Sequence, residues 1–189
     1  MVGGTLFWKI CRQNYINNKE DKMVSLQNMV KTNLEQHINI TSNITTLSYN
    51  YKTDELVYGD IDDFINTYSE FLEYMNDLYV DRRKYTNKDY RNFAIRLLNK
   101  RETVTFACIV NNCIIAFVNI GFNFINKSVR INEIFVREKY RHQGIGTKLL
   151  KMVENVAVND SYLDNLELSV NNNNEIAKNF YLKYGFKFK

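Results

Sequence analysis

The 189-residue chain has no proline, only three cysteines and two histidines, and no apolar run as long as a membrane helix. The odd number of cysteines, Cys11, Cys108 and Cys113, argues against a disulfide framework. His37 and His142 lie far apart and no Cys/His cluster has metal-ligand spacing, so we expect no metal. A membrane span needs about 18 or more apolar residues, and the interrupted N-terminal patch is a poor signal peptide. We therefore expect a soluble, cytoplasmic protein with no membrane partner.

The chain also lacks a large excess of either positive or negative charge. The net charge is +4 and the isoelectric point about 8.8, with basic residues scattered along the chain. This isoelectric point is lower than that of a typical nucleic-acid-binding domain, so we expect no nucleic-acid partner. Apolar residues make up 45% of the chain and aromatics 14%, which is enough for one core of ordinary size.

The order of hydrophobic patterns predicts a mixed α/β domain over residues 45–189. Two amphipathic helices come first, and three strands with short turns then form an antiparallel meander. A helix, a strand and a last helix follow, and the strand–helix–strand order predicts a parallel strand pair. Residues 1–44 are interpreted as an extension of unknown role with a helix over 23–40. The expected strands cover 45–51, 104–110, 113–124, 129–136 and 163–170, and the expected helices 61–75, 87–98, 145–158 and 174–184.

The stretch with the most chemical information runs from Ile131 to Leu150. It joins an apolar strand to a helix through a polar loop that contains Gly144 and Gly146. A helix start directs unpaired N–H groups and a positive dipole end at one point, where a phosphate or pyrophosphate binds well. A tight structural turn would need the same glycines. A P-loop does not fit the spacing, and a dinucleotide fingerprint lacks its third glycine because position 149 is leucine.

The same stretch carries a family resemblance. EIFVREKYRHQGIGTKLL resembles the acetyl-CoA-binding motif of the GCN5-related N-acetyltransferases (GNAT), in which Arg141, Gly144 and Gly146 match the family pattern. Downstream, residues 170–186 resemble the family's strand–Asn–helix segment, with Asn174, Tyr181 and then Gly-Phe in order. The resemblance covers about residues 45–189 and is strongest over 129–186.

The resemblance implies a GNAT-type fold: a mixed, mostly antiparallel central sheet flanked by helices, with a splayed parallel strand pair that holds the cofactor. It implies an acyltransferase that moves the acetyl group of acetyl-CoA to a primary amine of a small molecule or a protein. The alternative is an inactive acyl-CoA-binding or interaction module on the same fold, because fold alone does not establish activity.

The resemblance also assigns cofactor-binding roles. Backbone groups of one strand pair with the pantetheine arm, and those of the glycine loop hold the pyrophosphate. Asn174 matches the asparagine that contacts the arm, and it can cap the last helix as well. The residues so assigned are Ile134, Phe135, Val136, Arg141, His142, Gln143, Gly144, Ile145, Gly146, Thr147 and Asn174.

Acetylation of an amine needs a base, an oxyanion donor and an acid. Tyr181 matches the family tyrosine near the coenzyme sulfur and is the expected general acid, although a core aromatic is the other interpretation. Tyr184 matches a variable position. Glu133 is the candidate base, while a structural glutamate at a strand edge, or a water chain to another acceptor, are the alternatives. A backbone N–H near Val136 is the expected oxyanion donor.

The chain departs from the family at its C-terminal end. Two strands normally follow the Gly-Phe and close the sheet beside the acceptor site, whereas only residues 186–189 remain here. Because a bare edge promotes association, we expect residues 5–12 (TLFWKICR) or a second subunit, as a homodimer, to pack there.

Overall fold

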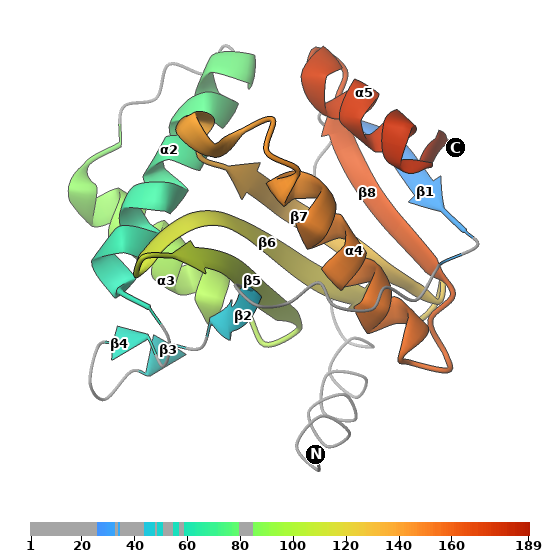
Figure 1. The fold of residues 1–189 in the computed structure, drawn as a ribbon, viewed down its shortest axis with the longest axis horizontal. Helices are drawn as coiled ribbons and strands as arrows, with labels where there is room; N and C mark the ends of the chain where they lie inside the picture. Colours follow the sequence, from blue (N-terminus) through green and yellow to red (C-terminus); the bar gives the residue numbers. More distant parts are fainter. Residues whose placement is uncertain are drawn as a thin grey trace.

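A computed structural model describes residues 26–32, 34, 44–47, 49–50, 55–56, 59–79 and 85–189, and the structural statements below concern these residues. A central sheet lies between two layers of helices (Figure 1). The helices are α2 Ile61–Tyr79, α3 Asn87–Leu98, α4 Ile145–Val158 and α5 Glu175–Tyr184, with a 3₁₀ turn at Glu138–Tyr140. The strands are β1 Leu26–Lys31, β2 Ile44–Leu47, β3 Tyr49–Asn50, β4 Glu55–Leu56, β5 Thr103–Val110, β6 Cys113–Asn123, β7 Ser128–Val136, β8 Asn165–Asn171 and β9 Lys187–Phe188.

The large sheet has seven strands in the order β2-β5-β6-β7-β8-β1-β9, and β3 and β4 form a separate pair. Every neighbouring pair of the large sheet is antiparallel except β7 and β8, which run parallel. The helix α4 crosses over between these two strands, as a parallel pair requires. The predicted GNAT-type mixed, mostly antiparallel sheet flanked by helices is therefore confirmed.

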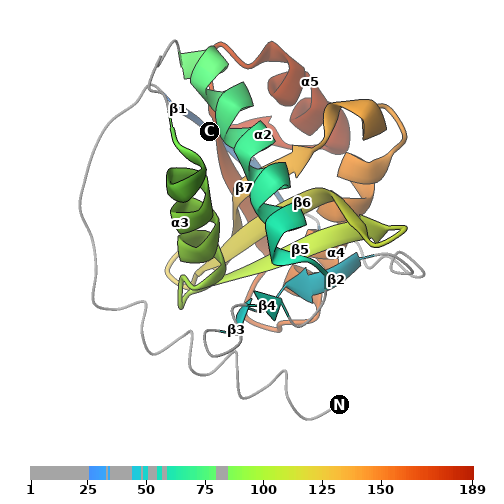
Figure 2. The same cartoon turned by 90° about the vertical axis from the view of Figure 1, so that its left-hand side faces the viewer.

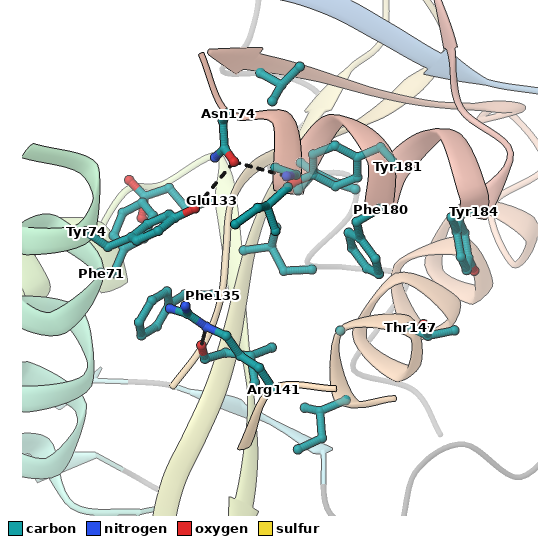
Figure 3. Close-up of a pocket in the computed structure, with 18 of the residues that line it drawn as sticks. Phe71, Tyr74, Glu133, Phe135, Arg141, Thr147, Asn174, Phe180, Tyr181 and Tyr184 are labelled. Atoms are coloured by element: carbon teal, nitrogen blue, oxygen red, sulfur yellow. Dashed lines mark hydrogen bonds between the residues drawn. The ribbon is translucent and has the colours of Figure 1, made fainter. Parts of the chain in front are cut away.

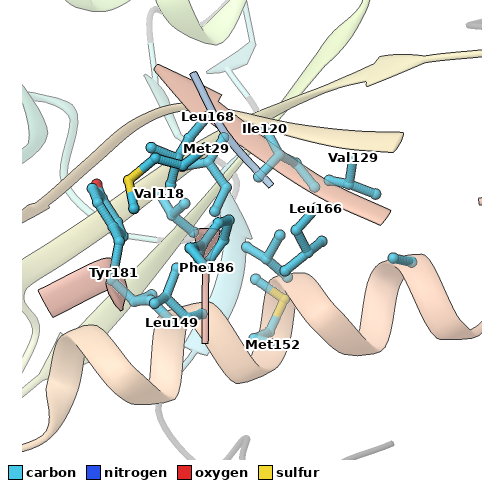
Figure 4. Close-up of a cluster of buried hydrophobic side chains, with 14 of the residues drawn as sticks. Met29, Val118, Ile120, Val129, Leu149, Met152, Leu166, Leu168, Tyr181 and Phe186 are labelled. Atoms are coloured by element: carbon cyan, nitrogen blue, oxygen red, sulfur yellow. The ribbon is translucent and has the colours of Figure 1, made fainter. Parts of the chain in front are cut away.

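Two apolar layers hold the helices to the sheet. On one face α2 and α3 pack over β5 and β6 (Figure 2). Phe64 and Phe117 are fully buried in this layer. On the other face α4 and α5 lie over β6, β7 and β8, where Leu149 packs beneath Phe186 and Met29 (Figure 4). Each fully buried side chain of this size contributes about 1.5–3 kcal/mol to stability. The two layers thus fix where β7, α4 and α5 meet.

The turns of the meander follow from their residues. Asn111 and Asn112 both have positive φ angles, 50° and 60°, as the tight hairpin between β5 and β6 requires, and asparagine tolerates this conformation. A capping box between Thr86 and Asp89 starts α3. The expected helix 87–98 begins and ends as predicted, as does 145–158.

The helix predicted over residues 23–40 is wrong, because residues 26–31 form β1. This strand pairs antiparallel with β8, from Leu26 opposite Asn171 to Lys31 opposite Leu166. Met29 is fully buried against the α4 layer. The hydrophobic spacing fitted a helix, but the free edge of β8 offers a ladder of backbone hydrogen bonds, and this tertiary pairing overrides local periodicity.

β1 therefore occupies the sheet edge that appeared open in the sequence. β9 pairs with the far side of β1 and ends the sheet. Residues 5–12, expected at this edge, lie outside the described residues, and the homodimer stays a prediction. The domain boundary at residue 45 also stays a prediction, although β1 argues for a start nearer the N-terminus. In the described part of the chain, no helix has the length and apolar character to cross a bilayer.

Candidate functional site

The parallel strands β7 and β8 stop pairing halfway along their length. Their register runs from Ser128 opposite Asn165 to Ile131 opposite Leu168, and beyond this point the strands diverge. The divergence opens a cavity of about 980 Å³ between α2, β7, β8, α4 and α5 (Figure 3). All of the predicted site residues except Gln143 line it.

The end of β7 presents backbone groups to this opening. The N–H of Arg137 donates to Ile115 O in β6, at 3.0 Å. Because successive residues of a strand point their backbone groups to opposite sides, those of Val136 and Ile134 face away from β6, toward the opening. The backbone of Phe135 faces β6 instead, and its buried ring lines the cavity. Ile134 and Val136 can therefore pair with an extended molecule between the strands.

The glycine loop forms one end of the cavity. His142 and Gly144 both have positive φ angles, 61° and 76°, which turn the chain sharply into α4. The first helical bond joins Lys148 N–H to Gly144 O, at 3.0 Å. The N–H groups of Ile145, Gly146 and Thr147 precede it and point out of the helix end, where an anion binds.

The two glycines serve different purposes. A Cβ added at Gly144 would meet no atom within 4 Å, so it would project into the open space beside the N–H groups. A Cβ at Gly146 would lie 3.1 Å from Phe180 Cζ, which is tighter than ordinary contact. Gly144 therefore keeps the anion end free, and Gly146 lets α4 and α5 approach closely.

The Arg141 side chain folds back onto the end of β7 rather than pointing out of the loop. Its Nε donates to Val136 O at 3.0 Å, and its guanidinium lies 5.2 Å from the ring centre of Tyr74 and 5.6 Å from that of Phe135. Its backbone N–H is already bonded to Glu138 O. The exposed Gln143 donates its side-chain amide to Lys139 O, at 3.3 Å. The Arg141 side chain thus stabilises the end of β7 beside the opening. The Gln143 side chain is bonded within the loop, so only its backbone could contact a ligand.

Asn174 lies where α5 begins, opposite the loop. Its Oδ1 caps the helix by accepting from Ala177 N–H at 3.0 Å, and it also accepts from the Tyr74 hydroxyl at 3.3 Å. Both bonds are drawn in Figure 3. The cap and the tie to α2 use the oxygen, so the amide NH₂ group remains the donor that Asn174 can offer to a ligand.

Glu133 is a carboxyl with incomplete hydrogen bonding. Oε1 accepts from the Tyr68 hydroxyl at 3.3 Å, whereas the buried Oε2 has no hydrogen-bond partner. Burial raises the pKa of Glu133 to about 7, and the Tyr68 hydrogen bond and Lys100 only partly oppose this. A carboxyl of this pKa exchanges a proton near neutral pH, as a general base must.

Tyr181 and Tyr184 lie one turn apart on α5 but in different surroundings. Tyr181 is 7% exposed, packs on Phe180 and Phe186, and lines the cavity. Burial, with Tyr74 nearby, raises its pKa, so its hydroxyl stays protonated at neutral pH. Tyr184 instead donates to Glu154 Oε2 at 2.7 Å. The Tyr184 hydroxyl is therefore committed to a structural contact.

Sequence reasoning missed the contribution of α2. Tyr68, Phe71 and Met75 belong to the apolar pattern that predicted the helix 61–75, and Tyr74 is not part of that pattern. In the structure Tyr68 bonds to Glu133, Tyr74 bonds to Asn174, and Phe71, Tyr74 and Met75 line the cavity. The signal was the hydroxyl groups: a buried tyrosine needs a hydrogen-bond partner. Two tyrosines on an otherwise apolar face therefore predict polar partners beneath the helix. Among the described residues, no group of three or more His, Cys, Asp or Glu side chains is placed to hold a metal ion.

A mixed sheet that opens between two parallel strands, beside a glycine-capped helix, places this chain in the class of acetyltransferase folds. The chain belongs to the acetyltransferase (GNAT) family, whose model matches residues 64–186. Membership in this family implies acyltransferase activity.

Individual relatives agree with this assignment. An uncharacterised N-acetyltransferase of Methanocaldococcus jannaschii is 30% identical over 158 residues, which cover 80% of this chain and 67% of that protein. A conserved protein of unknown function from Staphylococcus epidermidis has a TM-score of 0.58 at 17% identity, over 87% of this chain and 57% of that one. The PaiA N-acetyltransferase of Thermoplasma acidophilum, solved with coenzyme A, has a TM-score of 0.55 at 19% identity, over 77% of this chain and 91% of that one. At these identities the solved structures establish the fold alone.

Proposed function

We propose that the protein transfers the acetyl group of acetyl-CoA to a primary amine. The observation that carries this proposal is one continuous cavity with two chemically different ends. One end has the open N–H groups of Ile145, Gly146 and Thr147, and the other has Glu133 and Tyr181. The first suits a pyrophosphate, and the second suits proton transfers at a thioester.

The walls fit an extended cofactor arm between those ends. The backbone of Ile134 and Val136 can pair with its amides in the manner of an added strand, and the NH₂ group of Asn174 is a further donor. The open space at Gly144 leaves room for phosphate oxygens. Arg141, His142 and Gln143 would contribute through the shape of the loop.

In the proposed reaction the amine loses its proton to Glu133, and its nitrogen attacks the acetyl carbonyl carbon. The Val136 N–H lies on the side from which an oxyanion would be stabilised. The carbon–sulfur bond then breaks, the acetyl group stays on nitrogen, and the departing thiolate takes a proton from the Tyr181 hydroxyl. The nitrogen gives up its surplus proton to solvent, and solvent returns a proton to the Tyr181 oxygen and removes the one held by Glu133. The raised pKa of Glu133, about 7, suits a base that works near neutral pH.

An inactive acyl-CoA-binding module is the competing function. Its main support was the apparent loss of the closing strands, and that support weakens because β1 occupies this sheet edge. The acceptor, a small molecule or a protein amine, is not defined by the cofactor end of the cavity.

The test is an acetyl-CoA turnover screen that measures thiol release across amine classes, together with thermal unfolding. We expect acetyl-CoA to raise the melting temperature and at least one amine class to release thiol. Gly144→Val should abolish the thermal shift, because its side chain would fill the anion end and strain a backbone with positive φ. A thermal shift without thiol release from any amine would favour the inactive module, and no shift at all would contradict both functions.

A further inference from the structure

The cavity is also lined by an arginine to which the proposed function gives no role. Arg130 in β7 lines the cavity with Glu133, and its side chain is 41% exposed. Its Nη2 donates to Ser169 Oγ in β8 at 2.7 Å, and its Nη1 lies 3.8 Å from Glu167 Oε1. The guanidinium is therefore held in one orientation, yet remains accessible to solvent.

A β-bulge places Arg130 and Glu133 on the same face of the sheet. In a regular strand, residues three apart point to opposite faces. Here Asn119 pairs with Glu133 and Ile120 pairs with Ile131, so Asn132 is an extra residue in β7. The bulge reverses the alternation, as such insertions do.

Neighbouring contacts confirm this shared face. Arg130 reaches Ser169, which alternates along β8 with Leu168 and Val170 in the α4 layer. Glu133 reaches Tyr68 in α2, on the face opposite α4. Both side chains thus point away from α4, the helix whose N-terminus forms the anion end of the cavity.

Side-chain hydrogen bonds fix the bulge itself. The Asn132 side chain donates to Asn119 Oδ1 at 2.9 Å, and the fully buried Asn119 donates in turn to Thr105 at 2.9 Å and Thr103 at 3.2 Å. Gly121 makes room, because a Cβ there would lie 3.2 Å from Asn132 Nδ2. The relative placement of Arg130 and Glu133 is therefore built into the sheet.

Arg130 shares its carboxylate partner with a second cation. Glu167 is its only carboxylate partner among the described ion pairs, and Glu167 also lies 3.9 Å from Lys189 Nζ and accepts from Asn123 Nδ2 at 2.9 Å. Two cations thus share one carboxylate. A second carboxylate would complete this arrangement, because an arginine offers five N–H donors in a planar fork that fits such a group.

We propose that Arg130 is a specificity-determining residue, which binds a carboxylate carried by the amine acceptor while Glu133 takes the proton of the amine. The Cα atoms of Arg130 and Glu133 are three strand steps apart, at most about 10 Å. Their side chains can therefore contact two groups of one small acceptor, either a free amino acid with a terminal amine or a peptide with an acidic side chain near its N-terminus. This inference rests on the proposed amine acetylation.

The experiment compares matched acceptors that differ only in the carboxylate: 4-aminobutyrate against butylamine, and 6-aminohexanoate against hexylamine. A short peptide with Asp at its second position, against the same peptide with Asn, distinguishes the two sources of the carboxylate. Binding is measured calorimetrically in the presence of coenzyme A, and turnover by thiol release. Wild-type protein should prefer at least one carboxylate-bearing member, through KM and the dissociation constant rather than kcat.

Arg130→Gln should weaken binding of that acceptor about 10- to 100-fold, the range for a hydrogen bond between charged groups, and leave its uncharged partner unchanged. Arg130→Lys should restore part of the preference. Arg96→Gln changes an exposed arginine in α3 that does not line the cavity and should alter neither acceptor.

Equal binding of the charged and uncharged partners by wild type would overturn the proposal, as would equal losses for both in Arg130→Gln. These outcomes are distinct from failure of the proposed function, in which no amine releases thiol. The calorimetric measurement still tests Arg130 in that case, because it does not depend on turnover.

Discussion

Glu154 and Glu133 have opposite surroundings. Glu154 in α4 is fully buried, and its oxygens contact Lys31 Nζ at 2.6 Å and the Tyr184 hydroxyl at 2.7 Å. Glu133 in β7 has one long hydrogen bond from Tyr68 and one buried oxygen without a partner. Burial of a carboxyl oxygen without a hydrogen bond lowers stability, so such a group in a folded protein points to a role other than stabilisation.

The tyrosines of α5 repeat the contrast. Both tyrosines line the cavity, but the Tyr184 hydroxyl is bonded to Glu154, and the Lys31 ammonium lies 4.4 Å from the Tyr184 ring centre. One cluster, Lys31–Glu154–Tyr184, ties β1, α4 and α5 together. The other pair, Glu133 and Tyr181, has polar capacity left for a substrate. The first cluster stabilises the fold, and we propose that the second pair takes part in the reaction.

The largest effect should come from Glu133→Gln, which removes the proposed base and keeps the shape. We expect kcat to fall about 10²- to 10⁴-fold, the range of general base catalysis. The melting temperature at pH 8 should hold or rise, because an amide has no charge to bury. Thiol-release kinetics and calorimetry measure the two quantities, and a variant with wild-type kcat would assign Glu133 to a structural role.

Glu154→Ala should have the opposite pattern, a large loss of stability with no direct effect on the proposed catalytic groups. It leaves Lys31 without its ion-pair partner and should lower the free energy of unfolding by about 3–5 kcal/mol, as when one member of a buried pair is removed. Denaturant unfolding measures the loss. The double variant Lys31→Met, Glu154→Leu should recover most of it, because apolar packing can replace a buried pair. In that double variant kcat should stay at the wild-type value, and a hundredfold drop would break the distinction between the two clusters.

Tyr181→Phe should lower kcat about 10- to 100-fold, through loss of the proton donor to the leaving thiolate, with little change in stability. Tyr184→Phe is the matched control on the same helix. It should lower stability by about 1–3 kcal/mol, because the Glu154 oxygen loses a hydrogen bond, and it should leave kcat alone. The comparison would fail if the two variants affected rate and stability alike.

The smallest effect is the pH dependence of the wild-type protein. The pKa of Glu133 is raised to about 7, so the ionised base becomes more populated as pH rises toward that value. We expect kcat/KM to rise about tenfold per pH unit below pH 7 and then to level. Stability should change in the opposite sense: between about pH 4.5 and 7 the folded state holds a proton that the unfolded state has released, so stability falls as pH rises. Glu133→Gln should remove this contribution, and an unchanged profile in that variant would assign it to another group.

Sequence patterns predicted the scaffold well and the side-chain chemistry less well. The helices 87–98 and 145–158 and the meander follow from strong periodicity and turn residues such as Asn111 and Asn112. The glycine loop and Asn174 were identified by motif, and their geometry suits those roles. By contrast, the tie between Tyr74 and Asn174 joins α2 to α5, and no local pattern encodes a contact at that separation.

The bulge at Asn132 and the strand β1 were beyond sequence reasoning for a related reason. Alternation in 129–136 indicates a strand but not the inserted residue, which depends on Asn119 in the neighbouring strand. Residues 26–31 have a spacing that suits a helix, and only the open edge of β8 makes them a strand. In both cases the deciding partner lies in another part of the chain.

The position of β1 has a consequence for synthesis on the ribosome. β1 leaves the ribosome long before β8 and β9, the two strands with which it pairs. Until those strands emerge, the nascent chain carries a strand segment whose buried residue, Met29, has no core to enter. Pairing between such distant segments closes a long loop and is slow. Two segments far apart in the sequence thus become neighbouring strands, and this part of the sheet can be completed only after β9 has been synthesised.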